Sequence, residues 1–353
     1  MKRVAVLGVT GSIGQQALEI VESHPELELA AAASGSRPID GLAPLTQVGG
    51  DLTELLDRAE PDVVLNAVVG FAGLPATLWA LERGVTLALA NKESLVAAGE
   101  LALQARERGG GPLLPVDSEH SAAFQCLEGR APEQVDSLVL TGSGGPFRGR
   151  TREELEDVTP DEALAHPTWR MGPKITVDSA TLANKGLELL EAHFLFGLPY
   201  ERIEVVLQPT SVVHALVRFR DGASLAHLGY PDMRVPISFA LTYPERAATR
   251  IAPLDFSQGL VLQFEPPDLE TFPLLALARR AGEQGGTLPC AFNAANEVAV
   301  AAFLEGKLPF LGIAATVEET LAEVAGAPAR DLADLLDADA EARNLAEKGM
   351  KVA

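Results

Sequence analysis

Short apolar segments and amphipathic segments alternate over roughly the first third of the chain. Apolar, partly β-branched runs typical of buried strands fall at 4–7, 27–33, 61–67, 85–90 and 113–116. Helical patterns fall after the first run, to about residue 21, and again at 74–83. Strands that alternate with helices predict right-handed crossovers and a parallel sheet.

The pattern changes after residue 117. Glycine- and serine-rich turns come first, then a proline-rich loop at 166–173, a helix from about 180 to 196, and alternating strands at 204–207 and 212–219. Prolines punctuate the stretch 253–273, and the remaining residues are mostly amphipathic helix. We therefore predict an α/β protein with a parallel-sheet domain at 1–117, a central α+β domain at 118–245, a linker at 246–272 and a C-terminal helical domain at 273–353.

Composition narrows the functional classes. The 353 residues, 47% of them hydrophobic and 22% charged, suit a globular enzyme of two or three domains. A net charge of -21 with no basic block argues against nucleic-acid binding. Two distant cysteines argue against a disulfide framework or a thiolate zinc site. With no signal segment and no apolar run of membrane length, we expect no membrane partner and a cytoplasmic location.

Three glycines follow the first strand. Gly8, Gly11 and Gly14 lie three residues apart where a helix begins, and such a turn lets backbone N–H groups approach a dinucleotide pyrophosphate. The GxTGxxG spacing departs from the commoner GxGxxG form. The first domain is thus predicted to be of the Rossmann type, although a turn that only packs helix on strand is the alternative.

The end of the second strand bears on the cofactor. An acidic residue there would bind the ribose hydroxyl of NAD, whereas this chain has Gly35, Ser36 and Arg37. Small hydroxyl residues and an arginine suit the 2′-phosphate of NADP. The alternative is that Arg37 is a solvated loop charge.

Polar residues also follow two later strands. Asn91, Lys92 and Glu93 come after the strand 85–90, at the sheet edge where ligands bind in parallel sheets. Asp117 and Glu119 follow the strand 113–116 and would share a face if extended. Two converging carboxylates suit Mg²⁺ or Mn²⁺, although a DxE pair is usually solvated.

A third polar block lies on the predicted helix near 180–196. If this helix begins near Ser179, then Asn184, Lys185 and Glu188 share one side of it. That side can bind phosphate and complete a metal site, or it can be only a surface ion pair. The glycine run 142–147 adds hydroxyl and backbone donors that can form an anion nest.

Taken together and in order, the motifs resemble those of the 1-deoxy-D-xylulose 5-phosphate reductoisomerase family. They are GVTGSIG at 8–14, NKES at 91–94, DSEHSA at 117–122, GSGGPF at 142–147, HPTWRMG at 166–172, VDSATLANKGLE at 177–188, PDMRVPI at 231–237 and NAANEVAVAAFL at 293–304. The resemblance covers nearly the whole chain. Two differences are a segment between Arg37 and Asn91 that is shorter by about one βα unit, and Thr168 and Arg170 in the loop 166–173.

The resemblance implies an NADPH-dependent rearrangement and reduction of 1-deoxy-D-xylulose 5-phosphate to 2-C-methyl-D-erythritol 4-phosphate in isoprenoid precursor synthesis. It implies a homodimer, a lid at 166–173 that contains Trp169, and Mg²⁺ or Mn²⁺ held by Asp117, Glu119 and Glu188. NADPH contacts are expected from Thr10, Gly11, Ser12, Ile13, Gly35, Ser36, Arg37, Asn91, Glu93 and Gly172. Substrate contacts are expected from Lys92, Ser118, Glu119, Ser143, His166, Ser179, Asn184, Lys185 and Glu188, and catalytic roles from Lys92 and the three carboxylates.

The chemistry fits these residue types. A metal chelated by the carbonyl and hydroxyl oxygens polarises the ketone, and Lys92 can stabilise or relay a proton on those oxygens. Both an α-ketol shift and a retro-aldol/aldol path remain open. A semialdehyde dehydrogenase is a rival, but Cys126 and Cys290 lack the context of a nucleophile. A non-catalytic NADP-binding regulator would leave the carboxylates unexplained.

Overall fold

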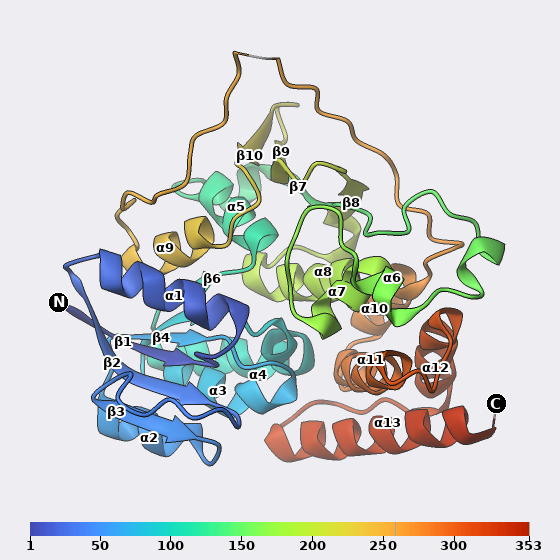
Figure 1. Cartoon of the computed structure of the whole chain (residues 1–353), viewed down its shortest axis with the longest axis horizontal. Coiled ribbons are helices and arrows are strands. Elements are labelled where there is room, and N and C mark those ends of the chain that lie inside the picture. Colours follow the sequence, from blue (N-terminus) through green and yellow to red (C-terminus); the bar gives the residue numbers. More distant parts are fainter. Residues whose placement is uncertain (258, 353) are drawn as a thin grey trace. The chain divides into compact units, whose positions relative to one another are not determined.

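The computed structural model describes residues 1–257 and 259–352 and consists of two compact units (Figure 1). The first unit contains 1–95, 99–125 and 232–254; the second contains 96–98, 126–231 and the residues from 255 onward. Among the described residues, no helix has both the length and the apolar character needed to cross a bilayer. The segment 232–254 joins the first unit, a grouping that the sequence did not suggest, and the domain boundaries proposed above stay predictions.

A six-stranded parallel sheet, in the order β3-β2-β1-β4-β5-β6, forms the centre of the first unit. Its strands are β1 (Lys2–Leu7), β2 (Leu27–Ser34), β3 (Leu45–Val48), β4 (Val63–Asn66), β5 (Thr86–Leu89) and β6 (Leu113–Pro115). The predicted parallel sheet is confirmed. Strand order reverses at β1, and in such sheets ligands bind outside the carboxyl ends of the strands near this switch point.

Helices cover both faces of this sheet (Figure 1). They are α1 (Ser12–Ser23), α2 (Leu52–Ala59), α3 (Leu74–Glu82), α4 (Lys92–Gly109), α5 (Ser118–Leu127, which runs into the second unit) and α9 (Arg234–Thr242). Helices α1 and α9 contact each other, as do α2 and α3. The core between α1, α9 and the strands is aliphatic, with Val4, Val6 and Ile237 at most 2% exposed.

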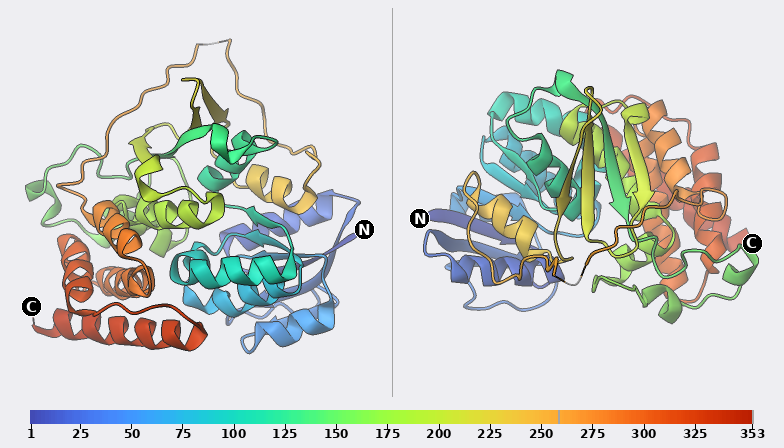
Figure 2. Two further views of the ribbon diagram at one scale, coloured as in Figure 1. Left: turned by 180° about the vertical axis from the view of Figure 1, so that it is seen from behind. Right: turned by 90° about the horizontal axis from the view of Figure 1, so that it is seen from above.

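The second unit contains a mixed four-stranded sheet in the order β10-β9-β7-β8 (Figure 2). Its strands are β7 (Val135–Gly142), β8 (Ile203–Leu207), β9 (Val213–Phe219) and β10 (Ser224–Leu228); β8 pairs parallel to β7, and the other pairs are antiparallel. Its helices are α6 (Pro160–Leu164), α7 (Pro173–Ala180), α8 (Ala183–Phe196), α10 (Leu274–Gln284), α11 (Leu288–Leu304), α12 (Phe310–Glu323) and α13 (Leu332–Val352). Helix α8 packs on the sheet, and α10 packs on α8.

Two local expectations need correction. The helix predicted from about 180 to 196 forms over Ala183–Phe196 (α8), but it does not begin near Ser179, because Leu182 adopts a left-handed conformation (φ +60°) and separates α7 from α8. Ser179 therefore lies on α7 and not on the helix of Asn184. Asp117 and Glu119 do not form an extended pair, because α5 begins at Ser118 and the Asp117 carboxylate accepts the backbone N–H of Glu119 (3.2 Å).

Candidate active site

The glycine turn brings backbone against backbone at the first strand–helix junction. Gly8 has φ +80°, and a Cβ there would lie 2.3 Å from the carbonyl oxygen of Ala67 on the neighbouring strand's extension. A Cβ on Gly14 would lie 2.4 Å from the carbonyl oxygen of Gly8. Gly11, which is exposed, precedes α1 and has no side chain to cap it. The first N–H groups of α1 are thus available to a ligand oxygen.

A cavity of about 980 Å³ opens beside this turn in the first unit. It is lined by Gly8, Thr10 and Gly11, by residues 33–37 after β2, by 49–53 at the start of α2, and by 67–69, 72 and 75. The predicted cofactor residues Thr10, Gly11, Gly35, Ser36 and Arg37 thus lie around one cavity. Ser12 and Ile13 begin α1 next to the lining residues, whereas Gly172 is in the second unit, before α7.

Asn91 fixes the carboxyl end of β5. Its amide donates to the carbonyls of Val68 (2.8 Å) and Gly70 (2.9 Å) and to the Glu93 carboxylate (3.1 Å), and its oxygen accepts the Ser94 hydroxyl. A Cβ on Gly73 would lie 2.5 Å from that oxygen, so only glycine fits there. Asn91 and Glu93 are therefore buried in a hydrogen-bonded network at the start of α4.

Lys92 and Asp117 meet across the ends of β5 and β6. The Lys92 ammonium lies 2.9 Å from an Asp117 carboxylate oxygen, and their side chains are 7% and 12% exposed. The Ser118 hydroxyl donates to Glu119 (2.7 Å). His120, fully buried with Nδ1 3.6 Å from Asp117, adjoins this group and was not singled out from the sequence. Only its place in the DSEHSA motif pointed to it.

In the second unit, three predicted substrate residues converge. His166 Nε2 lies 2.9 Å from the Ser143 hydroxyl and 3.1 Å from the Ser179 hydroxyl. A Cβ on Gly145 would lie 2.8 Å from the carbonyl oxygen of Ser179, so the glycine loop after β7 packs directly on the end of α7. Segments 36 residues apart in sequence are thereby joined into one polar cluster of Ser143, His166 and Ser179, called the anion pocket below because its donors suit an anion.

The protonation of His166 follows from its surroundings. Nδ1 accepts the backbone N–H groups of Thr168 (3.2 Å) and Trp169 (3.0 Å), so the neutral ring carries its proton on Nε2 and presents a donor toward the two serines. Burial of the ring, followed by the positive charge of Lys185, lowers the pKa of His166 to about 4. At neutral pH the ring is therefore an uncharged donor suited to an anion.

Asn184, Lys185 and Glu188 share one side of α8, as the sequence predicted. Both the Asn184 amide and the Lys185 ammonium donate to the Glu188 carboxylate, which is fully buried. The Lys185 stem also passes within 3.1 Å of where a Cβ on Gly142 would lie. A cation and a carboxylate thus lie beside the glycine loop that carries Ser143.

The loop 166–173 is held inside the second unit. The rings of Trp169 and His214 lie 6.3 Å apart, and the hydroxyls of Thr168 and Ser211 lie 3.2 Å apart. The loop begins at His166 and leads into α7, so it links His166 to the helix that carries Ser179. An aromatic side chain in this place is suited to covering a bound ligand.

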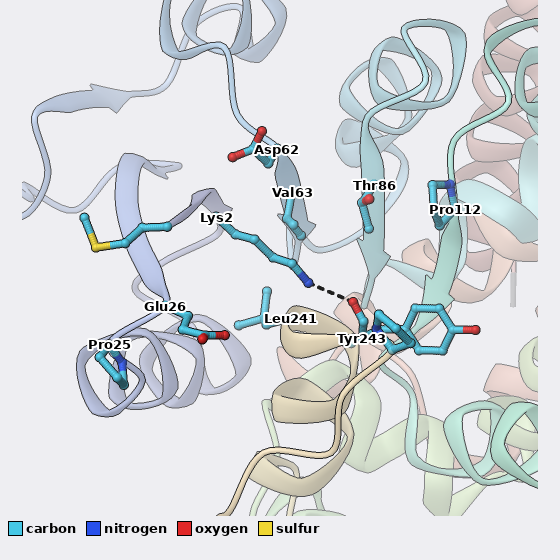
Figure 3. A pocket seen from close by; sticks show the side chains of 12 residues that line it. Lys2, Pro25, Glu26, Asp62, Val63, Thr86, Pro112, Leu241 and Tyr243 are labelled. Carbon is cyan, nitrogen blue, oxygen red and sulfur yellow. Dashed lines mark hydrogen bonds between the residues drawn. The ribbon is translucent and has the colours of Figure 1, made fainter.

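A second cavity, of about 770 Å³, lies at the opposite edge of the parallel sheet (Figure 3). It adjoins the amino ends of β1, β4 and β5, whereas in parallel sheets ligands bind at the carboxyl ends of the strands. The Lys2 ammonium, its main cation, donates to the Tyr243 carbonyl (2.7 Å) at the end of α9. The described residues that the sequence predicts for cofactor, metal and substrate all lie outside the lining of this cavity.

Models of one protein family match most of the chain. The model for 1-deoxy-D-xylulose 5-phosphate reductoisomerase matches residues 4–49 and 44–99, and the models for C-terminal domains of the same enzyme match 113–196 and 228–345. The reductoisomerase of Geobacillus kaustophilus is 49% identical, with 97% of this chain and 98% of that protein covered. That of Mycobacterium marinum is 48% identical, with 99% and 93% covered.

Solved structures agree. The Zymomonas mobilis reductoisomerase in complex with NADPH is 40% identical, with a TM-score of 0.90 and 99% of each chain covered. A reductoisomerase in complex with NADPH, fosmidomycin and magnesium is 37% identical, with a TM-score of 0.92 and 100% and 99% covered. The alignment with the Geobacillus protein runs over 374 positions, more than the 353 residues of this chain, so this chain lacks residues that the relative has.

Proposed function

Because the chain belongs to the 1-deoxy-D-xylulose 5-phosphate reductoisomerase family, we propose that the two groups of polar residues described above carry the activity of this family. The enzyme uses NADPH and a divalent metal to convert 1-deoxy-D-xylulose 5-phosphate into 2-C-methyl-D-erythritol 4-phosphate for isoprenoid synthesis. The observation that carries the assignment of residues is the anion pocket of Ser143, His166 and Ser179, which a NADP-binding regulator would not need.

NADPH is assigned to the cavity beside the glycine turn. The pyrophosphate lies against the N–H groups at Thr10, Gly11, Ser12 and Ile13, because the glycines allow backbone approach and α1 begins there. Gly35, Ser36 and Arg37 are exposed around the same cavity and hold the adenosine 2′-phosphate. Asn91, Glu93 and Gly172 complete the assigned cofactor residues.

The substrate phosphate is assigned to the second unit. Ser143 and Ser179 offer hydroxyl donors, His166 offers its Nε2–H, and Asn184 and Lys185 add an amide and an ammonium. Charge-assisted donors are the strongest available to a dianion, and they compensate locally for the net charge of -21. Holding the phosphate supplies binding energy that orients the reacting carbons. Ser118 is assigned to the substrate as well.

The divalent cation is assigned to Asp117, Glu119 and Glu188. Their donor set fits a hard cation, because all three offer carboxylate oxygens on side chains that are half-buried or fully buried; Asp117 and Glu188 pair with ammonium groups, and Glu119 accepts the Ser118 hydroxyl. When bound, Mg²⁺ or Mn²⁺ supplies Lewis-acid polarisation of the substrate carbonyl and hydroxyl oxygens.

Lys92 holds or moves the proton in this scheme. Its side chain is 7% exposed and its ammonium lies 2.9 Å from Asp117, so the ammonium can donate a proton to a developing alkoxide near the carboxylates. Trp169 on the loop 166–173 covers the substrate and excludes water before reduction, which protects the aldehyde formed by the rearrangement.

A homodimer in the cytoplasm completes the proposal. Strand β10 lies at the edge of its sheet, and its first three residues are exposed. In the later segment 256–264, the apolar side chains of Phe256, Leu260, Val261, Leu262 and Phe264 are 38–83% exposed. Light scattering of the purified protein tests the dimer, and a monomer at micromolar concentration would contradict it.

The residue assignment is tested with Glu188→Gln and Asp117→Asn. Each is expected to abolish metal-dependent NADPH oxidation while leaving the Kd for NADPH unchanged, because neither carboxylate lines the cofactor cavity. Glu191→Gln, one turn further along α8 and also buried, is the matched control and should retain turnover. Full activity of the wild type in EDTA, or of Glu188→Gln with metal, would overturn the metal assignment.

A further inference from the structure

Asp178 precedes Ser179 at the end of α7 and has partners of its own. Its side chain is 1% exposed, accepts the Asn296 amide at 2.8 Å, and lies 2.9 Å from the Lys174 ammonium. A buried carboxylate is costly unless such partners compensate for lost solvation. The last turn of α7 thus carries a substrate-facing hydroxyl and, one residue earlier, a carboxylate tied to α11.

The partner of Asp178 on α11 is Asn296. It is fully buried, and its amide oxygen has no hydrogen-bond partner among the described residues, whereas its amide nitrogen donates to Asp178. An apolar residue would pack there without leaving a buried oxygen unpaired. The amide therefore serves as a donor to Asp178.

Helix α11 is itself anchored to the C-terminal helix. Glu297 accepts the Asn293 amide (3.0 Å) and the guanidinium of Arg343 (2.6 Å), and Arg343 also pairs with Asp339 (2.7 Å) on α13. The Glu297–Arg343 ion pair ties α11, which carries Asn296, to α13, whereas the Asn293–Glu297 bond lies within α11. The NAANE segment of the sequence motif thereby joins the C-terminal helices to α7.

A displaced α7 would disturb the anion pocket at two points. Ser179 would turn away from His166 Nε2, now 3.1 Å away. The glycine loop would follow, because Gly145 packs against the carbonyl of Ser179 and the N–H of Gly145 donates to the Ser143 hydroxyl (3.1 Å). The left-handed Leu182 directly after α7 interrupts the helix, so α8 does not hold this turn by continuous helical hydrogen bonding.

We propose that Asn296 is a positioning residue for phosphate recognition: through Asp178 it fixes the last turn of α7, and with it the hydroxyls of Ser179 and Ser143. This rests on the proposed substrate site. It assigns to the C-terminal helices a role in substrate affinity, although Asn296 does not touch the substrate.

Asn296→Ala tests the proposal in the full-length enzyme. The Kd for inorganic phosphate, from a ³¹P NMR titration, and the KM for the sugar phosphate are each expected to rise about 10- to 100-fold, the scale of effect of misplaced binding groups. The Kd for NADPH should not change, because its cavity belongs to the first unit. Asn293→Ala is the matched control: it lies one turn earlier, is equally buried and donates to Glu297 instead of Asp178.

The control should lower the melting temperature without changing either phosphate constant. The exchange Asp178→Asn with Asn296→Asp restores an amide–carboxylate pair and is expected to recover at least part of the loss seen in each single variant. If Asn296→Ala does not fold, Lys174→Met, which removes the more exposed partner of Asp178, should weaken phosphate binding in the same direction.

Unchanged phosphate Kd and KM in a folded Asn296→Ala or Lys174→Met variant would overturn the proposal. So would an equal loss in Asn293→Ala, which would indicate a general structural effect. Failure of the proposed function is distinguishable, because there the wild type itself would not turn over the sugar phosphate, while its phosphate titration would still test the role of Asn296.

Discussion

Gly14→Ala perturbs the junction between β1 and α1 without adding polarity. Its Cβ would lie 2.4 Å from the Gly8 carbonyl oxygen and 2.5 Å from the Val9 Cα, and both are backbone atoms. Ordinary contacts of carbon are about 3.5–4.0 Å, so the turn and the start of α1 must separate by roughly 1 Å.

The expected magnitude combines two opposing effects. Overpacking of a tight site lowers the free energy of unfolding by about 1–3 kcal/mol, while replacing glycine by alanine inside a helix raises it by up to about 1 kcal/mol. The net loss is about 1–2 kcal/mol, which for a chain of 353 residues corresponds to a fall in Tm of roughly 1–3 °C. Because the displaced N–H groups are those proposed to bind the pyrophosphate, the Kd for NADPH should also rise about tenfold or more.

Gly11→Ala separates the two effects. Its Cβ would lie 3.3 Å from the Gly8 carbonyl oxygen, a contact that a small shift relieves, and the position is exposed in the cavity. The stability of the protein without cofactor should change by about 0.5 kcal/mol or less, while the Kd for NADPH rises because the methyl group occupies the place of close approach.

Thermal denaturation followed by circular dichroism, and titration of NADPH by fluorescence, measure both quantities. If Gly14→Ala left both the Tm and the NADPH Kd at wild-type values, the turn would not be packed as described. If Gly11→Ala bound NADPH normally, the pyrophosphate would not lie over this glycine.

Arg37→Ala should raise the KM for NADPH about 10- to 100-fold in steady-state assays, because a charge-assisted hydrogen bond to the 2′-phosphate is lost, and should leave the KM for NADH unchanged. Equal effects on both cofactors would show that Arg37 does not bind the 2′-phosphate. Because burial lowers the folded-state pKa of His166 to about 4, the unfolded chain takes up its proton first, so stability is full above about pH 6.5 and falls as the pH drops toward 4. Denaturant titrations should show a loss of about 1 kcal/mol for this half-buried ring, absent in His166→Phe. Burial raises the pKa of the Cys290 thiol to about 12 and also raises that of the other cysteine, so iodoacetamide at pH 8 should spare activity; rapid inactivation would favour a cysteine nucleophile.

Local sequence patterns predicted much of the first unit. Apolar runs flanked by helical periodicity predict strands whatever their partners are, and the three glycines mark a turn that requires close backbone approach. The i,i+3 and i,i+4 relation of Lys185 and Asn184 to Glu188 is likewise local, because helical geometry alone brings these side chains together.

Other features depend on tertiary contacts that no local pattern contains. The strands β3 (LTQV) and β10 (SLAHL) are too short to give a clear sequence pattern, and they are defined by the neighbours they pair with. Asp117 and Glu119 were expected to share a face only if the chain were extended there, whereas the helix that begins at Ser118 sets their geometry. The contact of Asp178 with Asn296 joins residues 118 positions apart, and periodicity cannot reveal such a pair.

The most direct test of the account is NADPH consumption by the purified enzyme with 1-deoxy-D-xylulose 5-phosphate and Mg²⁺ or Mn²⁺, followed by absorbance and by identification of the product. The account predicts oxidation that requires both sugar phosphate and metal, with one 2-C-methyl-D-erythritol 4-phosphate formed for each NADPH consumed. Folded protein that binds NADPH but shows no turnover with either metal would contradict it.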